Sequence, residues 1–312
     1  MSIALSFPFL SCSFEQTLPT ATPQPTATTT PSPTGTMSQT QIPSLSPVPF
    51  QRYGETLTDI IYCTTDNSPQ KMDVYFPDSG GPWPALVYVH GGSWMRGDKS
   101  EALMFAGSMT AQGYLVVSIN YRLYPPARFP AMIEDVKCAV RSLQANASEY
   151  NLDPNRIGAM GVSAGGHLVS LLGTSDESDG WDVGEYLDQS SRVRAVIAMA
   201  PVTDLSRSFP NADIEAMKHV GFGEDNVAAA SPITHVTSDD PPFLLIHGDR
   251  DRLVPYEQSQ LMYGRLVQMN VPAQLVIVKN ADHSFTAPNG TATPTLAEIN
   301  QIILDFLAKY LK

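Results

Sequence analysis

The sequence predicts an α/β protein built on a mostly parallel, eight-stranded sheet with helices on both faces. The first observation is that short apolar runs alternate along the chain with longer segments of helical periodicity. The second is that most of these runs are apolar throughout, as expected of strands buried on both faces of a sheet. The third is that no internal repeat recurs, which argues against a solenoid or a barrel of equal units.

The folded region is expected to begin near Arg52 with two antiparallel strands. Residues 57–62 form the first, and the alternating residues 71–76 return across a turn at residues 66–69. Residues 84–89 are a continuous apolar run and are predicted to be a buried central strand. The other expected strands are residues 115–120, 156–160, 195–200, 243–247 and 273–278.

The expected helices follow the strands in turn. The longest central one, residues 130–147, carries apolar side chains at helical spacing, namely Ile133, Val136, Val140 and Leu143. A helix over 99–112 should end at Gly113. The remaining expected helices are residues 166–172, 256–269 and the amphipathic residues 296–311.

Composition excludes several classes of function. The 312-residue chain has a formal net charge of −12 and no basic run, so nucleic acid is not an expected partner. Its three cysteines are too few for a disulfide framework or a cysteine-rich metal site. Cys63 and Cys138 could pair, but two free, buried thiols are the expectation.

The first fifty residues differ from the rest, so we divide the chain into residues 1–50 and a catalytic domain of residues 51–312. Residues 17–49 are rich in Thr, Pro and Ser without a charge, and are predicted to be a disordered spacer. The apolar residues 3–10 and Ser11-Cys12 resemble a bacterial lipobox, which would tether the protein to a membrane through lipidated Cys12. The alternative is an extension upstream of the true start. We expect an exported protein; otherwise it is cytoplasmic.

The chain is organised around Gly161-Val162-Ser163-Ala164-Gly165, between an expected strand and an expected helix. This pattern is typical of a nucleophile elbow. Glycines flank a turn too sharp for Cβ atoms, and the serine hydroxyl is left exposed at a helix N-terminus. Small residues at strand–helix contacts are the alternative explanation, so the context must decide.

A serine nucleophile needs a base and an orienting acid, which belong on loops after later strands. His283 follows the last strand and is the predicted base. Asp251 is the predicted acid, because it lies just before a helix, whereas Asp249 is expected to shape the turn and Asp282 to point away from His283. The other histidines are assigned structural roles or none: His90 and His247 in turns, His167 in packing, and His219 and His235 without partners at suitable spacing.

His90-Gly91-Gly92-Ser93-Trp94 follows the third strand. Glycines allow the backbone to approach a substrate and to direct N–H groups at a developing oxyanion. An ordinary Gly-Gly turn is the alternative. Upstream of an elbow, the segment predicts half of an oxyanion hole, with the N–H of Ala164 as the other half.

These motifs together resemble the α/β-hydrolases from about Tyr53 to the end of the chain. Within that fold the chain is similar to bacterial carboxylesterases related to hormone-sensitive lipase, and closer to the carbohydrate acetyl and feruloyl esterases. The segments that carry the resemblance are residues 90–94, 120–123, 129–136, 153–158, 161–167 and the Asp251 and His283 loops. Two positions depart from the lipase-like pattern, with Ser93 in place of Gly and Val162 in place of an acidic residue.

The resemblance implies a serine carboxylesterase with an α/β-hydrolase fold and no cofactor or metal. It makes Ser163 the nucleophile, His283 the base and Asp251 the acid; Gly92, Ser93 and Ala164 become oxyanion donors. Arg122, Glu134 and Asp135 are expected to form an ion-pair cluster. A minimal lid is expected over residues 204–237, with Phe209, Met217 and Phe222, so short acyl chains are predicted. The alternatives are an exopeptidase or amidase, and a non-catalytic binding protein on the same scaffold.

Overall fold

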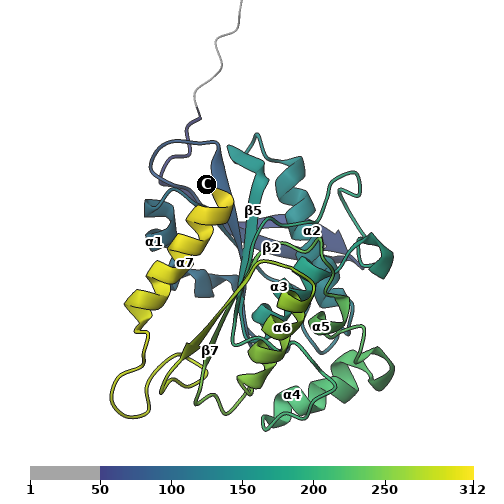
Figure 1. The fold of residues 1–312 in the computed structure, drawn as a ribbon. Coiled ribbons are helices and arrows are strands. Elements are labelled where there is room, and N and C mark those ends of the chain that lie inside the picture. The colour runs from purple at the N-terminus through teal and green to yellow at the C-terminus, as the bar shows by residue number, and fades with distance from the viewer. Residues whose placement is uncertain (1–49) are drawn as a thin grey trace, which may run out of the picture. The chain divides into compact units, whose positions relative to one another are not determined.

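A computed structural model describes residues 50–312 (Figure 1). The predicted spacer and the predicted lipid site at Cys12 lie outside the described residues. The described chain forms one eight-stranded sheet in the order β1-β2-β4-β3-β5-β6-β7-β8. The strands are Thr56–Thr65 (β1), Ser68–Tyr75 (β2), Trp83–Val89 (β3), Leu115–Ile119 (β4), Leu152–Val162 (β5), Val196–Met199 (β6), Phe243–Gly248 (β7) and Ala273–Val278 (β8).

The sheet is parallel from β4 to β8, and only β1 and β2 run antiparallel to their neighbours. The β1–β2 hairpin turns at Asp66 and Asn67, both with positive φ, as a tight hairpin turn requires. The α-helices are Ala106–Ala111 (α1), Ala131–Ala145 (α2), Ala164–Thr174 (α3), Ala212–Met217 (α4), Pro232–His235 (α5), Glu257–Gln268 (α6) and Leu296–Leu311 (α7). The predicted fold class is confirmed.

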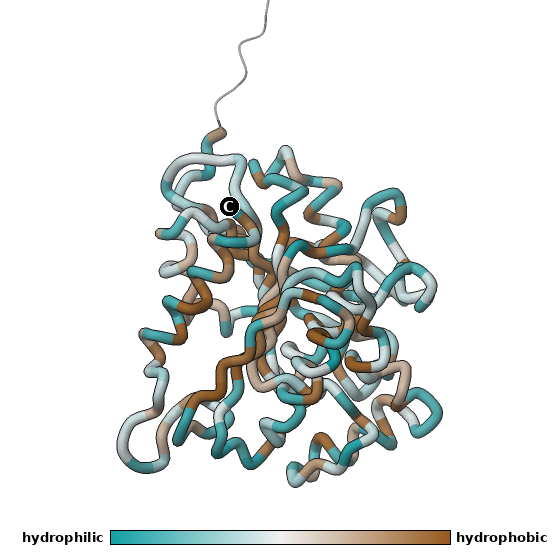
Figure 2. Tube along the Cα trace, in the orientation of Figure 1, coloured by the Kyte–Doolittle hydropathy of each residue, from teal (hydrophilic) through white to brown (hydrophobic). Residues whose placement is uncertain are grey.

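Two apolar cores lie on opposite faces of the sheet. Along β3, Val87 and Val89 face the core beneath α2, α3 and α6, while Leu86 and Tyr88 face the core beneath α1 and α7. Figure 1 shows these helices on either side of the strands, and Figure 2 shows the strands as the most apolar part of the chain. Burial on both faces explains why the central strands are continuous apolar runs.

Two expected elements differ in the structure. The helix expected over 99–112 is a 3₁₀-helix, Lys99–Met104 (η1), followed by α1, because Phe105 between them has a φ of −134°. The Phe105 ring packs edge-on against Tyr88, with ring centroids 4.8 Å apart. The expected lid region, residues 204–237, holds the short helices α4 and α5, a short π-helix, Lys218–Phe222 (η3), and a short 3₁₀-helix, Glu224–Asn226 (η4). Among residues 50–312, no helix combines the length and apolar character needed to cross a membrane.

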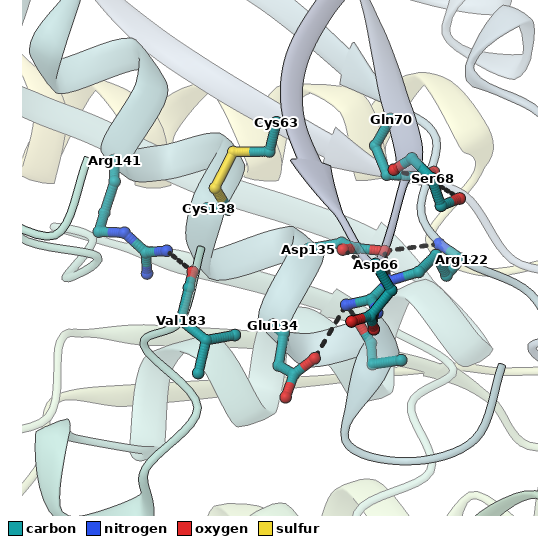
Figure 3. A network of polar contacts seen from close by, with 11 residues as sticks. Cys63, Asp66, Ser68, Gln70, Arg122, Glu134, Asp135, Cys138, Arg141 and Val183 are labelled. Carbon is teal, nitrogen blue, oxygen red and sulfur yellow. Dashed lines mark hydrogen bonds and ion pairs between the residues drawn. A yellow bond between two sulfur atoms is a disulfide. The ribbon is translucent and has the colours of Figure 1, made fainter. Parts of the chain in front are cut away.

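The expectation of free thiols was wrong. Cys63 of β1 and Cys138 of α2 form a disulfide, with their Cα atoms 6.3 Å apart (Figure 3). Both residues are buried. They are 75 residues apart in the chain, and only the packing of β1 beside α2 brings their Cα atoms within the range a disulfide spans.

The predicted ion-pair cluster is present near this disulfide (Figure 3). Arg122 donates from Nε to Asp135 at 2.9 Å and from Nη2 to Glu134 at 2.8 Å. Asp66, at the tip of the β1–β2 hairpin, accepts a further bond from Arg122 Nη1 at 2.8 Å. The guanidinium therefore ties the hairpin and the loop after β4 to the first turns of α2.

Candidate active site

Ser163 lies between the end of β5 and the start of α3. Its backbone has φ 57° and ψ −117°, a strained combination for a residue with a side chain. Gly165 allows the turn, because a Cβ there would lie 2.0 Å from the carbonyl oxygen of Val89 on the neighbouring strand. The strained backbone and the close approach of α3 to β3 are the geometry of a nucleophile elbow.

The predicted acid and base meet although they lie 32 residues apart. His283 follows β8, and its Nδ1 lies 2.6 Å from Asp251 Oδ2 in the loop after β7. The Asp251 side chain is fully buried, and its Oδ1 accepts the backbone N–H groups of Leu253 and Val254 at 2.8 and 2.9 Å. Since a carboxylate can only accept, His283 Nδ1 carries the proton and Nε2 is the nitrogen free to act as a base.

His247 also binds Asp251, a role the sequence analysis missed. Its ring is buried at the end of β7, and its Nε2 lies 3.1 Å from Asp251 Oδ2 and 3.0 Å from the carbonyl oxygen of Val254. Both neighbours are acceptors, so Nε2 carries the proton and Nδ1 accepts from the Ser259 hydroxyl at 2.7 Å. The sequence held one signal, the spacing of four residues between His247 and Asp251.

The charge on Asp251 is stabilised by this set of donors. Burial by itself would raise the pKa of the carboxyl, because it disfavours the charged form. Hydrogen bonds from His247 and His283, and from the backbone N–H of Val254, outweigh burial and hold the pKa well below its usual range. Asp251 is therefore ionised throughout the neutral pH range.

The two rival acids have other partners. Asp249 accepts the backbone N–H of Asn280 at 2.7 Å and so links the loops after β7 and β8. Asp282 accepts from the N–H groups of Ser284 and Thr286, both at 3.0 Å, within its own turn. Within residues 50–312 neither carboxylate is hydrogen-bonded to His283, in line with the preference for Asp251.

Of the remaining histidines, His90 and His167 are buried and pack, whereas His219 and His235 lie beside carboxylates. His90 stacks on Tyr121 with ring centroids 4.4 Å apart. His167 is buried in α3, where Nδ1 accepts from Trp94 Nε1 at 3.1 Å and Nε2 donates to the Ala230 carbonyl at 2.7 Å. His219 and His235 each lie 3.1 Å from a carboxylate, of Glu224 and of Asp179.

The segment after β3 lies against the elbow. Gly92 has φ 106°, and a Cβ there would lie 2.0 Å from the carbonyl oxygen of Arg96, so only glycine fits. Within the described part of the chain, the N–H groups of Gly92, Ser93 and Ala164 donate no hydrogen bond. Gly92 and Ser93 line a cavity together with Ser163, so their N–H groups are available to a ligand there; Ala164 is buried directly after Ser163 and is not part of the cavity wall.

This cavity, which we call the serine cavity, has a volume of about 450 Å³. Ser163 and His283 both line it, but no hydrogen bond joins their side chains within residues 50–312. Such bonds often tighten only when a substrate binds. Six other side chains in its wall are apolar, namely Met104, Val162, Met199, Ile214, Leu253 and Phe285, and the wall also includes the charged Arg96 and Glu101.

The expected lid takes a different form. Phe209, Met217 and Phe222 are buried in the apolar core and do not line the serine cavity. The Phe222 ring, for example, packs against Trp94 with centroids 4.9 Å apart. Instead, the region contributes Asn211 and Ile214, at the start of α4, to the cavity wall.

The chain is similar in sequence to a known protein family and to curated esterases. Residues 72–266 match the family model described as BD-FAE. The chain belongs to the BD-FAE family. The chain is 32% identical over 239 residues to a curated relative, esterase LipC of Mycobacterium tuberculosis. The matched region covers 72% of this chain and 58% of LipC. The chain is likewise 32% identical to the probable carboxylic ester hydrolase LipM of the same organism, spanning 56% of that protein.

Solved structures of similar fold include esterases. A truncated carbohydrate esterase from gut microbiota aligns with a TM-score of 0.69 and 26% identity, over 83% of this chain and 96% of that one. Esterase 2 of Thermogutta terrifontis, solved with butyrate, aligns with a TM-score of 0.69 and 26% identity, over 80% of this chain and 93% of that one. The predicted resemblance to α/β-hydrolase esterases is therefore confirmed.

Proposed function

We propose that this BD-FAE protein is a serine carboxylesterase that hydrolyses short-chain acyl esters. The observation that supports this most directly is that His283, whose Nδ1 lies 2.6 Å from the buried Asp251 carboxylate, lines the same cavity as Ser163. The esterases among its relatives support the reaction class.

The reaction proceeds through an acyl-enzyme. Ser163 Oγ attacks the ester carbonyl and passes its proton to His283 Nε2. The N–H groups of Gly92, Ser93 and Ala164 bind the oxyanion, each contributing roughly 3 kcal/mol. His283 then donates the proton to the leaving alcohol oxygen, and afterwards takes a proton from the water that releases the acid.

The serine cavity favours a small acyl group. Its volume is about 450 Å³, and much of its wall is apolar. Esterase 2 of Thermogutta terrifontis has been solved with butyrate and with propionate, both short acids. The carbohydrate esterase among the neighbours supports esters of carbohydrates as natural substrates, and we propose acetyl or feruloyl esters within that class.

Replacement of the nucleophile tests the proposal. We expect Ser163→Ala to lower kcat for p-nitrophenyl acetate by about 10⁴-fold or more. Ser190→Ala is a control, because Ser190 is exposed and lies beside a different cavity. Full activity in Ser163→Ala would refute the proposal, and faster cleavage of aminoacyl amides than of esters would indicate an amidase.

Paraoxon offers an independent test of the same serine. Esterase 2 of Thermogutta terrifontis has been solved in a form phosphorylated by paraoxon. We expect paraoxon to inactivate this protein by transferring one diethylphosphoryl group to Ser163 Oγ with release of p-nitrophenolate, as peptide mass spectrometry would show. Modification at another residue would exclude Ser163 as the nucleophile.

We also propose that the protein works outside the cytoplasm. The disulfide between Cys63 and Cys138 supports this location, because such bonds persist mainly in oxidising compartments. A membrane tether through Cys12 belongs to this proposal. Cell fractionation of the wild type and of Cys12→Ala tests it: the wild type should partition with membranes and the variant should not. Recovery of both from the cytoplasm would contradict it.

A further inference from the structure

A second cavity adjoins the serine cavity on the far side of His283. Its volume is about 650 Å³, and it shares Leu253, His283 and Ser284 with the serine cavity. We call it the arginine groove. Its lining is polar, whereas that of the serine cavity is mostly apolar: Arg250, Arg252, Asn280, Asp282, Pro288 and Asn289 complete it.

The arginine groove carries positive charge in an acidic protein. The formal net charge is −12, yet the groove holds two arginines and one carboxylate, Asp282. That carboxylate accepts hydrogen bonds from the N–H groups and hydroxyl of its own turn and offsets one of the two positive charges, so the lining keeps an excess of one positive charge. Within residues 50–312, Arg252 has no ion pair, and the nearest carboxylate oxygen to Arg250 is that of Asp249, 4.0 Å away.

The chemistry of ester cleavage decides which part of a substrate enters the groove. His283 Nδ1 is bound to Asp251, so Nε2 must protonate the leaving alcohol oxygen. The alcohol portion therefore passes along the imidazole ring. The acyl portion remains beside Ser163, Met199 and Ile214 in the apolar serine cavity.

We propose that the arginine groove binds the alcohol portion of the substrate, and that this portion carries a carboxylate; this inference rests on the proposed esterase function. Arg250 and Arg252 offer planar forks of N–H donors that match a carboxylate. Leu253, which is 41% exposed between them and the serine cavity, offers an apolar contact for the C–H face of a sugar ring. An acylated uronic acid unit has all of these features.

Matched substrates test the assignment. A mono-acetylated methyl glucuronoside and the corresponding methyl glucoside, acetylated at the same hydroxyl, differ by one carboxylate. We expect kcat/KM to be about tenfold higher for the glucuronoside, as two exposed ion pairs allow. The preference should shrink at high salt, because exposed charges are screened. The pair 3-acetoxybenzoate and 3-acetoxybenzamide shows whether the carboxylate suffices without a sugar ring.

Charge removal completes the experiment. In Arg250→Gln/Arg252→Gln the glucuronoside-to-glucoside ratio should fall close to one. The control Arg192→Gln/Arg194→Gln removes the same charge just before β6, at the amino end of that strand, whereas the groove lies at the carboxyl ends of β7 and β8; it should leave the ratio unchanged. Both groove arginines are exposed, and thermal melts check that the variants fold.

The outcomes separate the two proposals. A wild-type ratio of one or below, or a ratio that survives loss of both groove arginines, overturns the assignment while p-nitrophenyl acetate is still cleaved. Failure to cleave any of these esters, p-nitrophenyl acetate included, overturns the proposed function and this inference with it.

Discussion

Oδ2 of Asp251 accepts hydrogen bonds from two imidazoles, His283 at 2.6 Å and His247 at 3.1 Å. His247 is buried behind the carboxylate, whereas His283 lines the serine cavity. The second imidazole therefore positions Asp251. Its hydrogen bond also partly compensates the carboxylate charge, so that this charge acts less strongly on His283. This arrangement allows His247 to influence catalysis without touching the substrate.

Removal of His247 should change the pH profile of the esterase. Without the N–H of His247, the Asp251 charge acts more strongly on His283 and favours its protonated form. In His247→Phe we expect the acid limb of kcat/KM to move to higher pH. His247→Gln, which keeps an N–H donor, should restore part of the wild-type profile. An unmoved acid limb in a folded His247→Phe protein would restrict His247 to a structural role.

The two aspartates after β7 should respond differently to substitution. Asp251→Asn removes the charge that orients His283 and stabilises its protonated form, and we expect kcat/KM to fall by about 10⁴-fold. Asp249→Ala leaves the Asn280 N–H without its acceptor, which should cost about 1 kcal/mol of unfolding free energy with a far smaller loss of activity. Ester kinetics and urea denaturation of both variants measure this; the opposite ranking would make Asp249 the catalytic acid.

The disulfide should stabilise the protein without serving the reaction. It cross-links β1 to α2 across 75 residues of chain, so its removal enlarges the unfolded ensemble. We expect Cys63→Ser/Cys138→Ser to lose about 2–4 kcal/mol of unfolding free energy and to keep its kcat/KM on p-nitrophenyl acetate at 25 °C. Dithiothreitol should lower the melting temperature of the wild type and leave that of the variant unchanged. Equal melting temperatures for the oxidised wild type and the variant would contradict this.

Asp240 should make stability depend on pH. Burial raises its pKa to about 6, so the folded state binds an extra proton between about pH 4 and pH 6. The unfolding free energy therefore falls as pH rises through this window. Above the window Asp240 is ionised in both states, and the unfolding free energy stays at its lowered value. Asp240→Asn keeps an acceptor for Thr237. At pH 8 its unfolding free energy should exceed that of the wild type by on the order of 1–3 kcal/mol.

The same variant provides its own control. Near pH 4 the Asp240 carboxyl is protonated in the folded protein, so Asp240→Asn and the wild type should have similar melting temperatures there. A stability gain that does not change between pH 4 and pH 8 would mean that ionisation of Asp240 is not its source.

Local sequence determined much of the fold. The apolar runs at β3, β4 and β7 predicted buried parallel strands, because strands covered on both faces carry mostly apolar side chains; Ser118 and His247 are polar exceptions. The glycines around Ser163 predicted the sharp turn. A Cβ at these positions would clash with backbone atoms a few residues away or on the adjacent strand, so only glycine fits. The loops after β7 and β8 were predicted to carry the acid and the base, because in this fold both residues lie on loops that follow later strands at the carboxyl edge of the sheet.

Other features depended on contacts that no local pattern encodes. The sequence left the Cys63–Cys138 pair open, and it could not show that His247 turns its ring toward Asp251. Nor could it show that Phe209, Met217 and Phe222 point into the core rather than over the serine cavity. The arginine groove exists only because the loops after β7 and β8 lie side by side.

By itself, then, the sequence determined the order of strands and helices, the elbow at Ser163 and the residue types on the loops that follow. The tertiary structure decided which side chains meet: the disulfide, the second imidazole on Asp251 and the charged groove beyond His283. The physical reason is that periodicity and turn chemistry act over a few neighbouring residues. Side-chain partners are chosen instead by the packing of segments far apart in the chain.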